Sequence, residues 1–394
     1  MPEAYHILML GQVSARGLKR FPHNYVVSDQ VNEPDAILVR SQNMHEMVIP
    51  STVKAIARAG AGTNNIPVQR MNDRGVPVFN APGANANAVK ELVIAAILIA
   101  SRNLVQAIRF VNTLQGDDET LGKKVEEGKK QFSGFELPHR SLGIIGLGAI
   151  GGMVADAAIK LGMRVIGFDP EITVEAAWSV PSQAKKAHSI DELLKYSDFI
   201  SLHVPLVDAT KNMIDANHVN KMRQGVVLLN FARDGLVDED AVLAALGSKK
   251  IRYYMCDFPS AKLKDQPGVV ALPHLGASTQ EAEDNCGVMV VDQVRDYLEN
   301  GNILNAVNFP NVIMMRESPY RVGIANANVP NMVGQISTTM AQAGLNIHNM
   351  MNKSKGAMAY TLVDVDSPVS GKVIQQIASI SGVLSVRNLP AQVK

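Results

Sequence analysis

Short apolar runs alternate with stretches of helical spacing along most of the chain. Alternation of this kind predicts parallel β-sheets whose two faces are covered by helices. It occurs in two regions, one before about residue 90 and one between residues 141 and 275. We expect strands at 7–10, 25–27, 36–39 and 76–79 in the first region, and at 141–146, 164–169, 199–203, 226–230, 253–257 and 269–272 in the second.

Three longer stretches have the spacing of helices. A buried helix is expected from Leu92 onward, and its apolar stretch 92–100 is too short to cross a bilayer. A second helix is expected at 153–161. A third covers 285–299 and ends at the stop signal Asn300-Gly301.

The pattern changes after Asn308-Phe-Pro-Asn311. The remainder predicts a βαββαβ unit of about eighty residues. We expect its strands at 321–326, 346–351, 357–365 and 383–386, and its helices at 332–343 and 372–381. The predicted fold class is therefore α/β, with two Rossmann-like parallel-sheet domains followed by this small unit.

Composition narrows the class of protein. The 394 residues are 46% apolar, enough for the cores of two or three domains. A net charge of +1 provides no basic surface for nucleic acid. Two cysteines, Cys256 and Cys286, cannot form a disulfide framework or a metal site. The first residues lack a signal-peptide pattern, so we expect a cytoplasmic protein without metal, membrane or nucleic-acid partners.

A glycine motif, Gly146-Leu-Gly148-Ala-Ile-Gly151, lies between a predicted strand and a predicted helix. Strand, glycine turn, helix and second strand form the dinucleotide-binding unit. Gly146 allows the tight turn, Gly148 lets the backbone approach a pyrophosphate, and Gly151 lets helix and strand pack closely. We expect Gly146, Gly148, Ala149, Ile150 and Gly151 to contact the cofactor, with its phosphates at the helix N-terminus.

Asp169 ends the second strand, about twenty residues after the turn. A carboxylate there accepts hydrogen bonds from the adenosine ribose and repels a 2′-phosphate. The predicted cofactor is therefore NAD.

Several segments together resemble a known family, the D-2-hydroxyacid dehydrogenases. They are Ala59-Gly-Ala-Gly-Thr-Asn-Asn-Ile66, Asn80-Ala-Pro-Gly83, Gly146 to Gly151, His203-Val-Pro-Leu206, Asn230-Phe-Ala-Arg-Asp-Gly-Leu-Val-Asp238 and Leu272-Pro-His-Leu-Gly-Ala-Ser-Thr279. The tail after residue 309 resembles an ACT regulatory domain. Within the family, such a tail is typical of the enzymes that act on D-3-phosphoglycerate.

The resemblance implies a discontinuous architecture. Residues 1–90 and 283–306 would form the substrate-binding domain, 91–282 the NAD-binding domain, and 309–394 the ACT-like regulatory domain. It also implies the oxidation of D-3-phosphoglycerate to 3-phosphooxypyruvate at the entry to L-serine biosynthesis, by a homodimer or homotetramer.

Two catalytic residues follow from the family motifs. His274 matches the acid–base histidine, whose imidazole exchanges a proton near neutral pH. Arg233 matches the substrate arginine, whose planar guanidinium pairs with a carboxylate bidentately. Asp234 stands where the family usually has glycine, and it places a negative charge beside Arg233.

The family's third catalytic residue, a glutamate, is missing. Between Asp257 and His274 the chain contains no glutamate, Lys262 stands near the expected position, and Asp265 is the nearest carboxylate downstream. Three hypotheses remain open. Asp265 substitutes for the glutamate, the histidine acts without a carboxylate, or Lys262 contributes as a cation or proton carrier with a pKa lowered by desolvation.

Further cofactor contacts are implied by the resemblance. Asp257 would accept from the nicotinamide carboxamide, with Cys256 as the alternative alignment. The remaining expected contacts come from four of the family motifs: His203, Val204, Pro205, Phe231, Ala232, Arg233, His274, Gly276 and Ala277.

Substrate binding is expected at two places besides Arg233 and His274. Ala61 and Gly62 resemble the loop whose backbone N–H groups hold the carboxylate, where small residues allow close approach. Arg40 matches a phosphate-binding arginine, although Gln42 replaces the second basic residue that often follows.

In the tail, Asn328 and Asn346 match positions that hold an amino-acid effector such as serine across a paired interface. Asn326 replaces the common histidine, and Asn331 replaces a glycine whose left-handed backbone asparagine can adopt. A tail that only mediates dimerisation is the alternative.

Two other functions stay open. One is a glyoxylate, hydroxypyruvate or D-lactate type reductase without a phosphate site. The other is an NAD-sensing regulatory protein built on the same fold. Retention of Arg233 and His274 disfavours the second of these.

Overall fold

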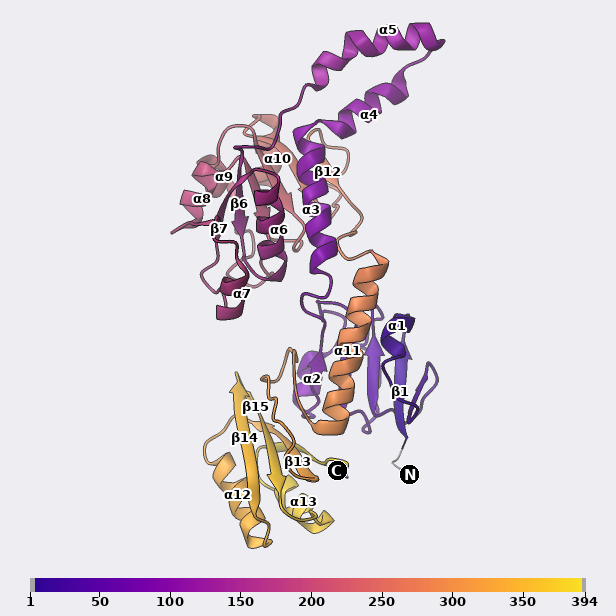
Figure 1. Cartoon of the computed structure of the whole chain (residues 1–394), viewed down its shortest axis with the longest axis vertical. Helices are drawn as coiled ribbons and strands as arrows, with labels where there is room; N and C mark the ends of the chain where they lie inside the picture. Colours follow the sequence, from indigo (N-terminus) through magenta and orange to yellow (C-terminus); the bar gives the residue numbers. More distant parts are fainter. Residues whose placement is uncertain (1–3, 392–394) are drawn as a thin grey trace. The chain divides into compact units, whose positions relative to one another are not determined.

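The computed structural model describes residues 4–391, and the chain divides into two compact units (Figure 1). One consists of Met1–Asn85 with Gln280–Lys394, and the other of Ala86–Thr279. Residues 1–3, which belong to the stretch examined for a signal peptide, and residues 392–394 lie outside the described part. Each unit is built on its own parallel sheet, as the alternating pattern predicts.

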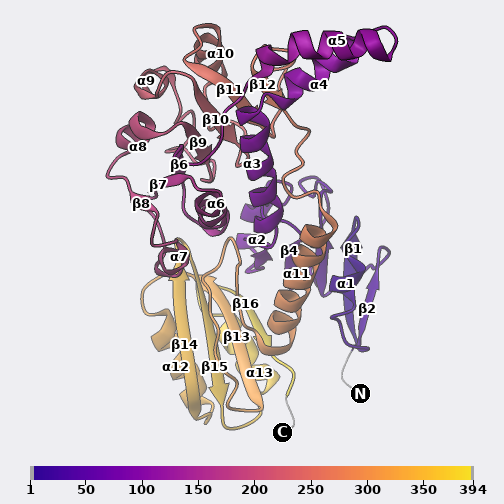
Figure 2. The ribbon, with the colours of Figure 1, turned by 45° about the horizontal axis from the view of Figure 1, so that its top comes forward.

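The unit 86–279 contains seven parallel strands in the order β12-β11-β10-β9-β6-β7-β8. Successive residues of its strands face opposite cores, so Ile144 packs with α3 and α6 while Ile145 packs with α8, α9 and α10. Figure 2 shows α3 and α6 side by side on one face. The strands are β6 (Ser141–Ile145), β7 (Arg164–Phe168), β8 (Lys185–Lys186), β9 (Phe199–Leu202), β10 (Val226–Asn230), β11 (Ile251–Cys256) and β12 (Val269–Ala271). The helices around them are α3 (Ala86–Ser101), α6 (Ala149–Lys160), α7 (Val174–Ser179), α8 (Ile190–Tyr196), α9 (Ala216–Lys221) and α10 (Glu239–Gly247).

An arm not predicted from the sequence follows α3. It consists of α4 (Leu104–Thr113), α5 (Asp118–Gly128) and the 3-10 turn Lys129–Phe132, and it extends away from the sheet of its own unit (Figure 1). Neither helix buries a residue, because the apolar face of α4 is turned to solvent.

No single helix in the described residues is long and apolar enough to cross a membrane. Only α3 and α4 taken together reach that length and composition, and they are bent by 61° at the break between them.

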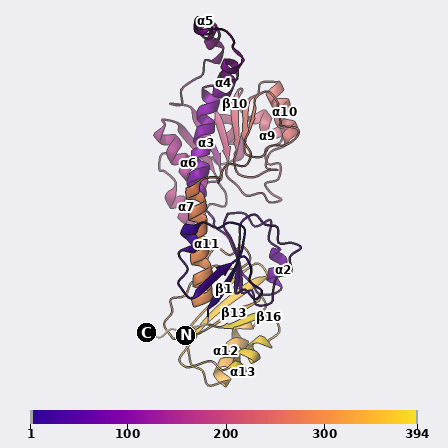
Figure 3. The ribbon, with the colours of Figure 1, turned by 90° about the vertical axis from the view of Figure 1, so that its right-hand side faces the viewer.

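The other unit contains five parallel strands in the order β2-β1-β3-β4-β5. The long helix α11 (Gln280–Asn300) covers one face of this sheet (Figure 3), and α2 (Val68–Asn72) contributes to the core on the other. The strands are β1 (Tyr5–Leu10), β2 (Tyr25–Ser28), β3 (Ala36–Val39), β4 (Ala55–Arg58) and β5 (Val78–Phe79), and the short helix α1 (Ala15–Leu18) follows β1.

The tail forms a four-stranded antiparallel sheet in the order β14-β15-β13-β16. The helices α12 and α13 pack on one face of this sheet, and Figure 3 shows them below β13 and β16. Its other face is also buried, because Tyr360 and Leu362 share a core with Phe79 and Tyr297 of the five-stranded sheet and α11. The elements are β13 (Tyr320–Ala327), α12 (Met332–Gln342), β14 (Ile347–Lys355), β15 (Met358–Val365), α13 (Gly371–Ala378) and β16 (Val383–Asn388), in the predicted βαββαβ order.

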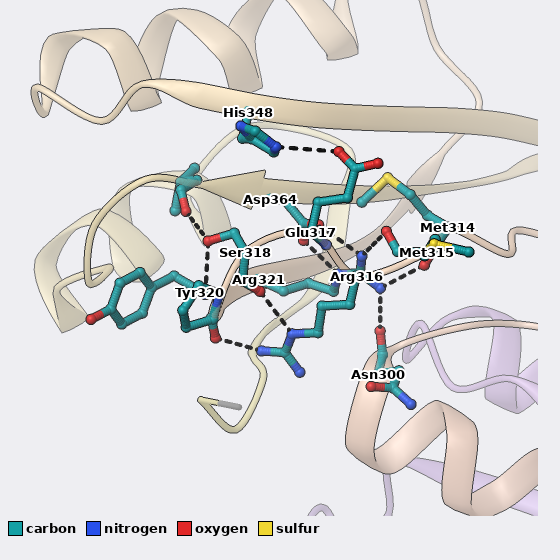
Figure 4. Close-up of polar contacts among 12 residues, drawn as sticks. Asn300, Met314, Met315, Arg316, Glu317, Ser318, Tyr320, Arg321, His348 and Asp364 are labelled. Atoms are coloured by element: carbon teal, nitrogen blue, oxygen red, sulfur yellow. Dashed lines mark hydrogen bonds and ion pairs between the residues drawn. The ribbon is translucent and has the colours of Figure 1, made fainter. Parts of the chain in front are cut away.

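The tail also caps the C-terminal end of α11. The last four carbonyls of a helix lack partners within it. Here each accepts from a tail arginine: Arg387 donates to Tyr297 and Leu298 at 3.1 and 3.0 Å, and Arg316 to Glu299 at 3.1 Å. Arg321 donates to Asn300 at 3.1 Å, the contact drawn in Figure 4. Three cations at the negative end of the helix dipole stabilise this end of α11.

Arg321 is the centre of this joint. It is fully buried, and its Nε and Nη2 bind the equally buried Asp364 carboxylate at 2.6 and 2.8 Å. Its other donors reach the carbonyls of Met314 and Met315, both at 2.9 Å (Figure 4). The buried guanidinium is therefore paired and hydrogen-bonded, as burial of a charge requires.

Candidate functional site

The predicted glycine turn lies at the carboxyl end of β6. Gly146 has φ +93°, which favours glycine, and a Cβ on it would lie 2.5 Å from the carbonyl oxygen of His203. A Cβ on Gly151 would lie 2.0 Å from the Gly146 oxygen, so α6 approaches the turn as closely as the motif predicts. Space around Gly148 is open, and this residue begins α6 without a side-chain cap. The first N–H groups of α6 are thus available to an anion.

Asp169 follows β7 and is tied to the same turn. Its Oδ2 accepts from the backbone N–H of Leu147 at 2.8 Å, and its Oδ1 accepts from Glu171 at 3.0 Å. A cavity of about 560 Å³ lies beside the carboxylate, large enough for a flat apolar ring system. It is lined by Leu147, Gly167, Phe168, Asp169, Pro170, Ile172, Ala177, Val180, Lys186, Ala187 and His188.

A buried aspartate shapes the loop of His274. The Asp257 carboxylate is 1% exposed, and its two oxygens accept from the backbone N–H groups of Leu275 and Gly276, both at 2.7 Å. Its carbonyl oxygen accepts from the N–H of His274 at 3.1 Å. Three consecutive backbone groups are therefore fixed by one residue at the end of β11.

His274 itself adopts φ +58°, an uncommon conformation for a residue with a Cβ. Its side chain is exposed, and its ring meets the Phe258 ring edge-on with centroids 5.1 Å apart. Within the described part of its unit, the imidazole has no carboxylate partner. Neither Asp265 nor a glutamate of that part of the unit contacts this histidine.

Arg233 follows β10 and is exposed. Its Nη1 donates to the Ala232 carbonyl at 2.6 Å. The loop is held by Asn230, a 1% exposed side chain that donates to the Arg233 carbonyl at 2.9 Å and accepts from the Ala232 N–H at 3.2 Å. Asn230 was not among the predicted site residues, although a polar residue at the end of an apolar strand indicates such a role. Asp234 folds onto its own loop, where its Oδ1 accepts from the Gly235 N–H at 2.8 Å.

The expected pKa of Lys262 is wrong in direction. The ammonium lies exposed and binds both oxygens of Asp240, at 2.8 and 2.9 Å. This hydrogen bond and its charge raise the pKa of Lys262, where desolvation was expected to lower it. Asp265, at φ +60°, lies exposed in a turn beside a cavity lined by Val105, Arg109 and Lys264.

His203 follows β9 and lies partly buried at the carboxyl ends of the strands. Its Nε2 lies 2.9 Å from the Ser201 hydroxyl, its Nδ1 is buried without a partner among the described residues, and burial lowers its pKa to about 4. Cys256 is also buried, which raises its thiol pKa to about 11. The other expected cofactor residues lie after β9, β10 and β12, at the same edge: Val204, Pro205, Phe231, Ala232, Gly276 and Ala277.

The substrate residues of the other unit also follow parallel strands. Arg40 comes after β3, and the 60–62 loop comes after β4. Arg58, not singled out from the sequence, joins them: its Nε donates to the Arg40 carbonyl at 2.8 Å and its Nη1 to the Gly62 carbonyl at 2.6 Å. A cation at the end of a strand was the signal, but β4 was not predicted.

In the tail, Asn328 and Asn346 do not converge. Asn328 follows β13 and bonds to Gly356 beyond one end of β15, whereas Asn346 pairs with Asp366 beyond the other end. Strand geometry puts the two ends of β15 roughly 24 Å apart. Asn331 has φ 64°, the left-handed backbone expected there.

A seven-stranded parallel sheet, a glycine turn and a carboxylate at the next strand end define an NAD-dependent dehydrogenase. Residues 94–276 match the D-isomer specific 2-hydroxyacid dehydrogenase NAD-binding domain. The chain belongs to the family of D-isomer specific 2-hydroxyacid dehydrogenases, as the sequence motifs predict.

Named relatives support this assignment. The chain is 31% identical over 382 residues to D-3-phosphoglycerate dehydrogenase of Escherichia coli K12, covering 92% of this chain and 88% of the relative. The Methanocaldococcus jannaschii enzyme of that name is 37% identical over 293 residues, covering 72% of this chain, which spans about half (53%) of its length. The NAD-bound 3-phosphoglycerate dehydrogenase of Entamoeba histolytica has a TM-score of 0.60 at 27% identity, covering 77% of this chain and 99% of that one.

Proposed function

We propose that the chain oxidises D-3-phosphoglycerate to 3-phosphooxypyruvate with NAD, the first step of L-serine biosynthesis. The observation that carries this proposal is the loop of His274. Asp257 accepts three hydrogen bonds from backbone N–H groups of this loop, two of them with its carboxylate, and the imidazole is exposed at the carboxyl ends of the strands of a dinucleotide-binding sheet. Ligands of open α/β sheets bind at that edge. Relatives of the chain carry the name of this activity.

The residues present fit NAD. The open first turn of α6 suits the pyrophosphate, Asp169 the ribose hydroxyls, and the adjoining cavity the adenine. We assign the carboxamide to Asp257 rather than Cys256, because a carboxylate oxygen can accept a second hydrogen bond beside the one from Leu275 or Gly276, whereas the Cys256 thiol already donates to the Phe258 carbonyl. When bound, NAD accepts the hydride that leaves C2 of the substrate.

The side chains supply the rest of the reaction. His274 removes the C2 hydroxyl proton as the hydride leaves and returns it in the reverse direction. Arg233 pairs with the carboxylate and the developing carbonyl. The backbone N–H groups of Ala61 and Gly62 hold the carboxylate, and Arg40 holds the phosphate. In this proposal the histidine acts without a carboxylate partner, the second of the three hypotheses.

Each domain has the function that the family pattern implies. We propose that residues 1–90 and 283–306 bind substrate, 91–282 bind NAD, and 309–394 regulate. Because Asn328 and Asn346 lie beyond opposite ends of β15, a serine molecule held by both needs two tails, one from each of two copies. The exposed apolar residues of α4, with Leu104 at 41%, Ile108 at 60% and Val111 at 53%, favour a homodimer or homotetramer.

A second candidate is an unphosphorylated 2-hydroxy acid reductase, for example for glyoxylate or hydroxypyruvate. One observation favours it: Arg40, the assigned phosphate ligand, is already paired with a carboxylate.

A substrate panel separates the two candidates. Initial rates are measured with D-3-phosphoglycerate, 3-phosphooxypyruvate, hydroxypyruvate and glyoxylate, with NAD(H) and NADP(H), and with and without serine. Because the oxidation is uphill, the reverse direction is the more sensitive assay. The highest kcat/KM for the phosphorylated pair supports our proposal, and a preference for glyoxylate or hydroxypyruvate refutes it.

A further inference from the structure

The guanidinium of Arg40 is held by a carboxylate from another part of the chain. Glu283 lies in the first turn of α11, and its Oε1 is 2.6 Å from Nη2 of Arg40. The two side chains are 35% and 38% exposed, so the pair lies at a surface that a ligand can reach.

No other carboxylate shares this guanidinium among the described residues. The neighbouring Asp284 turns to Ser14, whose hydroxyl donates to it at 2.5 Å, and to Gln280. Arg58 approaches from β4, but it binds the carbonyl oxygens of Arg40 and Gly62. Among the described residues, Glu283 is therefore the one negative side chain that contacts Arg40, the residue assigned to the phosphate.

A substrate phosphate and Glu283 need the same donors. A phosphate group with nearly two negative charges either displaces the carboxylate from Nη2 or binds beside it and is repelled. Gln42 supplies no second cation to offset that repulsion. A substrate without phosphate avoids the conflict, because it does not use Arg40.

We propose that Glu283 is a specificity-determining residue, which competes with the substrate phosphate for Arg40 and so limits the preference for phosphorylated over unphosphorylated 2-hydroxy acids. This inference rests on the proposed function, which assigns the phosphate to Arg40. The expected effect of Glu283 on substrate affinity is only several-fold, because solvent screens charge pairs that are exposed.

The test compares Glu283→Gln with the matched variant Asp284→Asn, which removes the same charge one residue away. We expect Glu283→Gln to lower KM about three- to tenfold for D-3-phosphoglycerate and 3-phosphooxypyruvate, and to leave KM for hydroxypyruvate within twofold. Asp284→Asn should change neither. Glu283→Asp, which keeps the charge on a shorter side chain, should stay near the parent.

Three results overturn the proposal: a higher KM for the phosphorylated substrates, an equal change for both substrate types, or the same change in Asp284→Asn. Inorganic phosphate separates this failure from that of the proposed function. Glu283→Gln should bind it more tightly than the parent in calorimetric titration even if the parent oxidises no phosphoglycerate. Unchanged phosphate affinity in Glu283→Gln refutes the competition whatever the substrate proves to be.

Discussion

The backbone N–H of His274 donates to the carbonyl of Asp257, and the Asp257 carboxylate binds the next two N–H groups of the same loop. These hydrogen bonds fix the left-handed backbone conformation of His274, which residues other than glycine rarely adopt without such support. The exposed imidazole is therefore positioned by the main chain that carries it, while no acid from the described residues of the same unit contacts its ring.

Replacing the histidine tests its proton-transfer role. His274→Ala should lower kcat by about 10² to 10⁴, the usual contribution of a positioned acid–base group, while NAD binding persists. Steady-state rates and NADH titration by fluorescence measure the two effects separately. A kcat near that of the parent would remove His274 from the mechanism.

Arg233 should act chiefly on substrate affinity. Arg233→Lys keeps the charge but loses the planar pair of donors, so we expect KM to rise by tenfold or more with a smaller change in kcat. Arg223→Lys, at an exposed arginine that pairs with the largely buried Asp198 in the same unit, serves as the control. Equal effects of the two variants would contradict the assignment.

Cofactor choice should follow Asp169. The parent should prefer NADH over NADPH, because a 2′-phosphate would lie against this carboxylate. Asp169→Asn keeps an acceptor for the Leu147 N–H and should narrow the preference at least tenfold without disturbing the turn. Equal kcat/KM for the two cofactors in the parent would place Asp169 away from the ribose.

Lys262 should prove dispensable. Its exposed ammonium is paired with Asp240, so Lys262→Ala should lower kcat less than about twofold. Asp265→Asn should also have little effect, because no carboxylate among the described residues of its own unit contacts His274. A loss of tenfold or more in Lys262→Ala would restore this lysine as a catalytic residue. The same loss in Asp265→Asn, with its pH–rate profile moved to lower pH, would assign the orienting role to Asp265.

His203 should make stability depend on pH. Its folded pKa of about 4 is below the ordinary value of 6.5, so the unfolded chain binds the proton first as the pH falls. The contribution of the neutral ring is complete above pH 6.5 and is lost between pH 6.5 and 4, by about 3 kcal/mol. Denaturant unfolding at several pH values should show a shallower decline in His203→Gln than in the parent and the exposed-site control His188→Gln.

The elements that were predicted from the sequence are specified by residues that lie close together in the chain. The glycine turn, its flanking strands and the βαββαβ tail are each specified by apolar spacing and by glycines within short windows. The strand β4 was not predicted, because Ala55-Ile-Ala-Arg58 contains one large apolar residue and so does not stand out as an apolar run. The arm was not predicted, because the apolar residues of α4 face solvent and do not belong to a core that their spacing would indicate.

Site features that depend on distant partners could not be predicted. The contact between Arg40 and Glu283 joins residues 243 positions apart, and a local pattern contains no information about that pairing. The same holds for the ion pair of Lys262, which lies in a turn and whose partner Asp240 lies in α10, 22 positions earlier. Residue types indicated the chemistry, but the fold decided which charges meet.

The arginine cap on α11 has a consequence for how the tail can be exchanged. A chain cut after Asn308 would remove the arginine donors from all four carbonyls of the last turn and would expose Tyr297 to water. The tail therefore cannot be removed or swapped as an independent module, as a tethered domain can. Any replacement would have to bring its own cations to the same three positions, so we expect deletion of the tail to destabilise the five-stranded sheet unit as well.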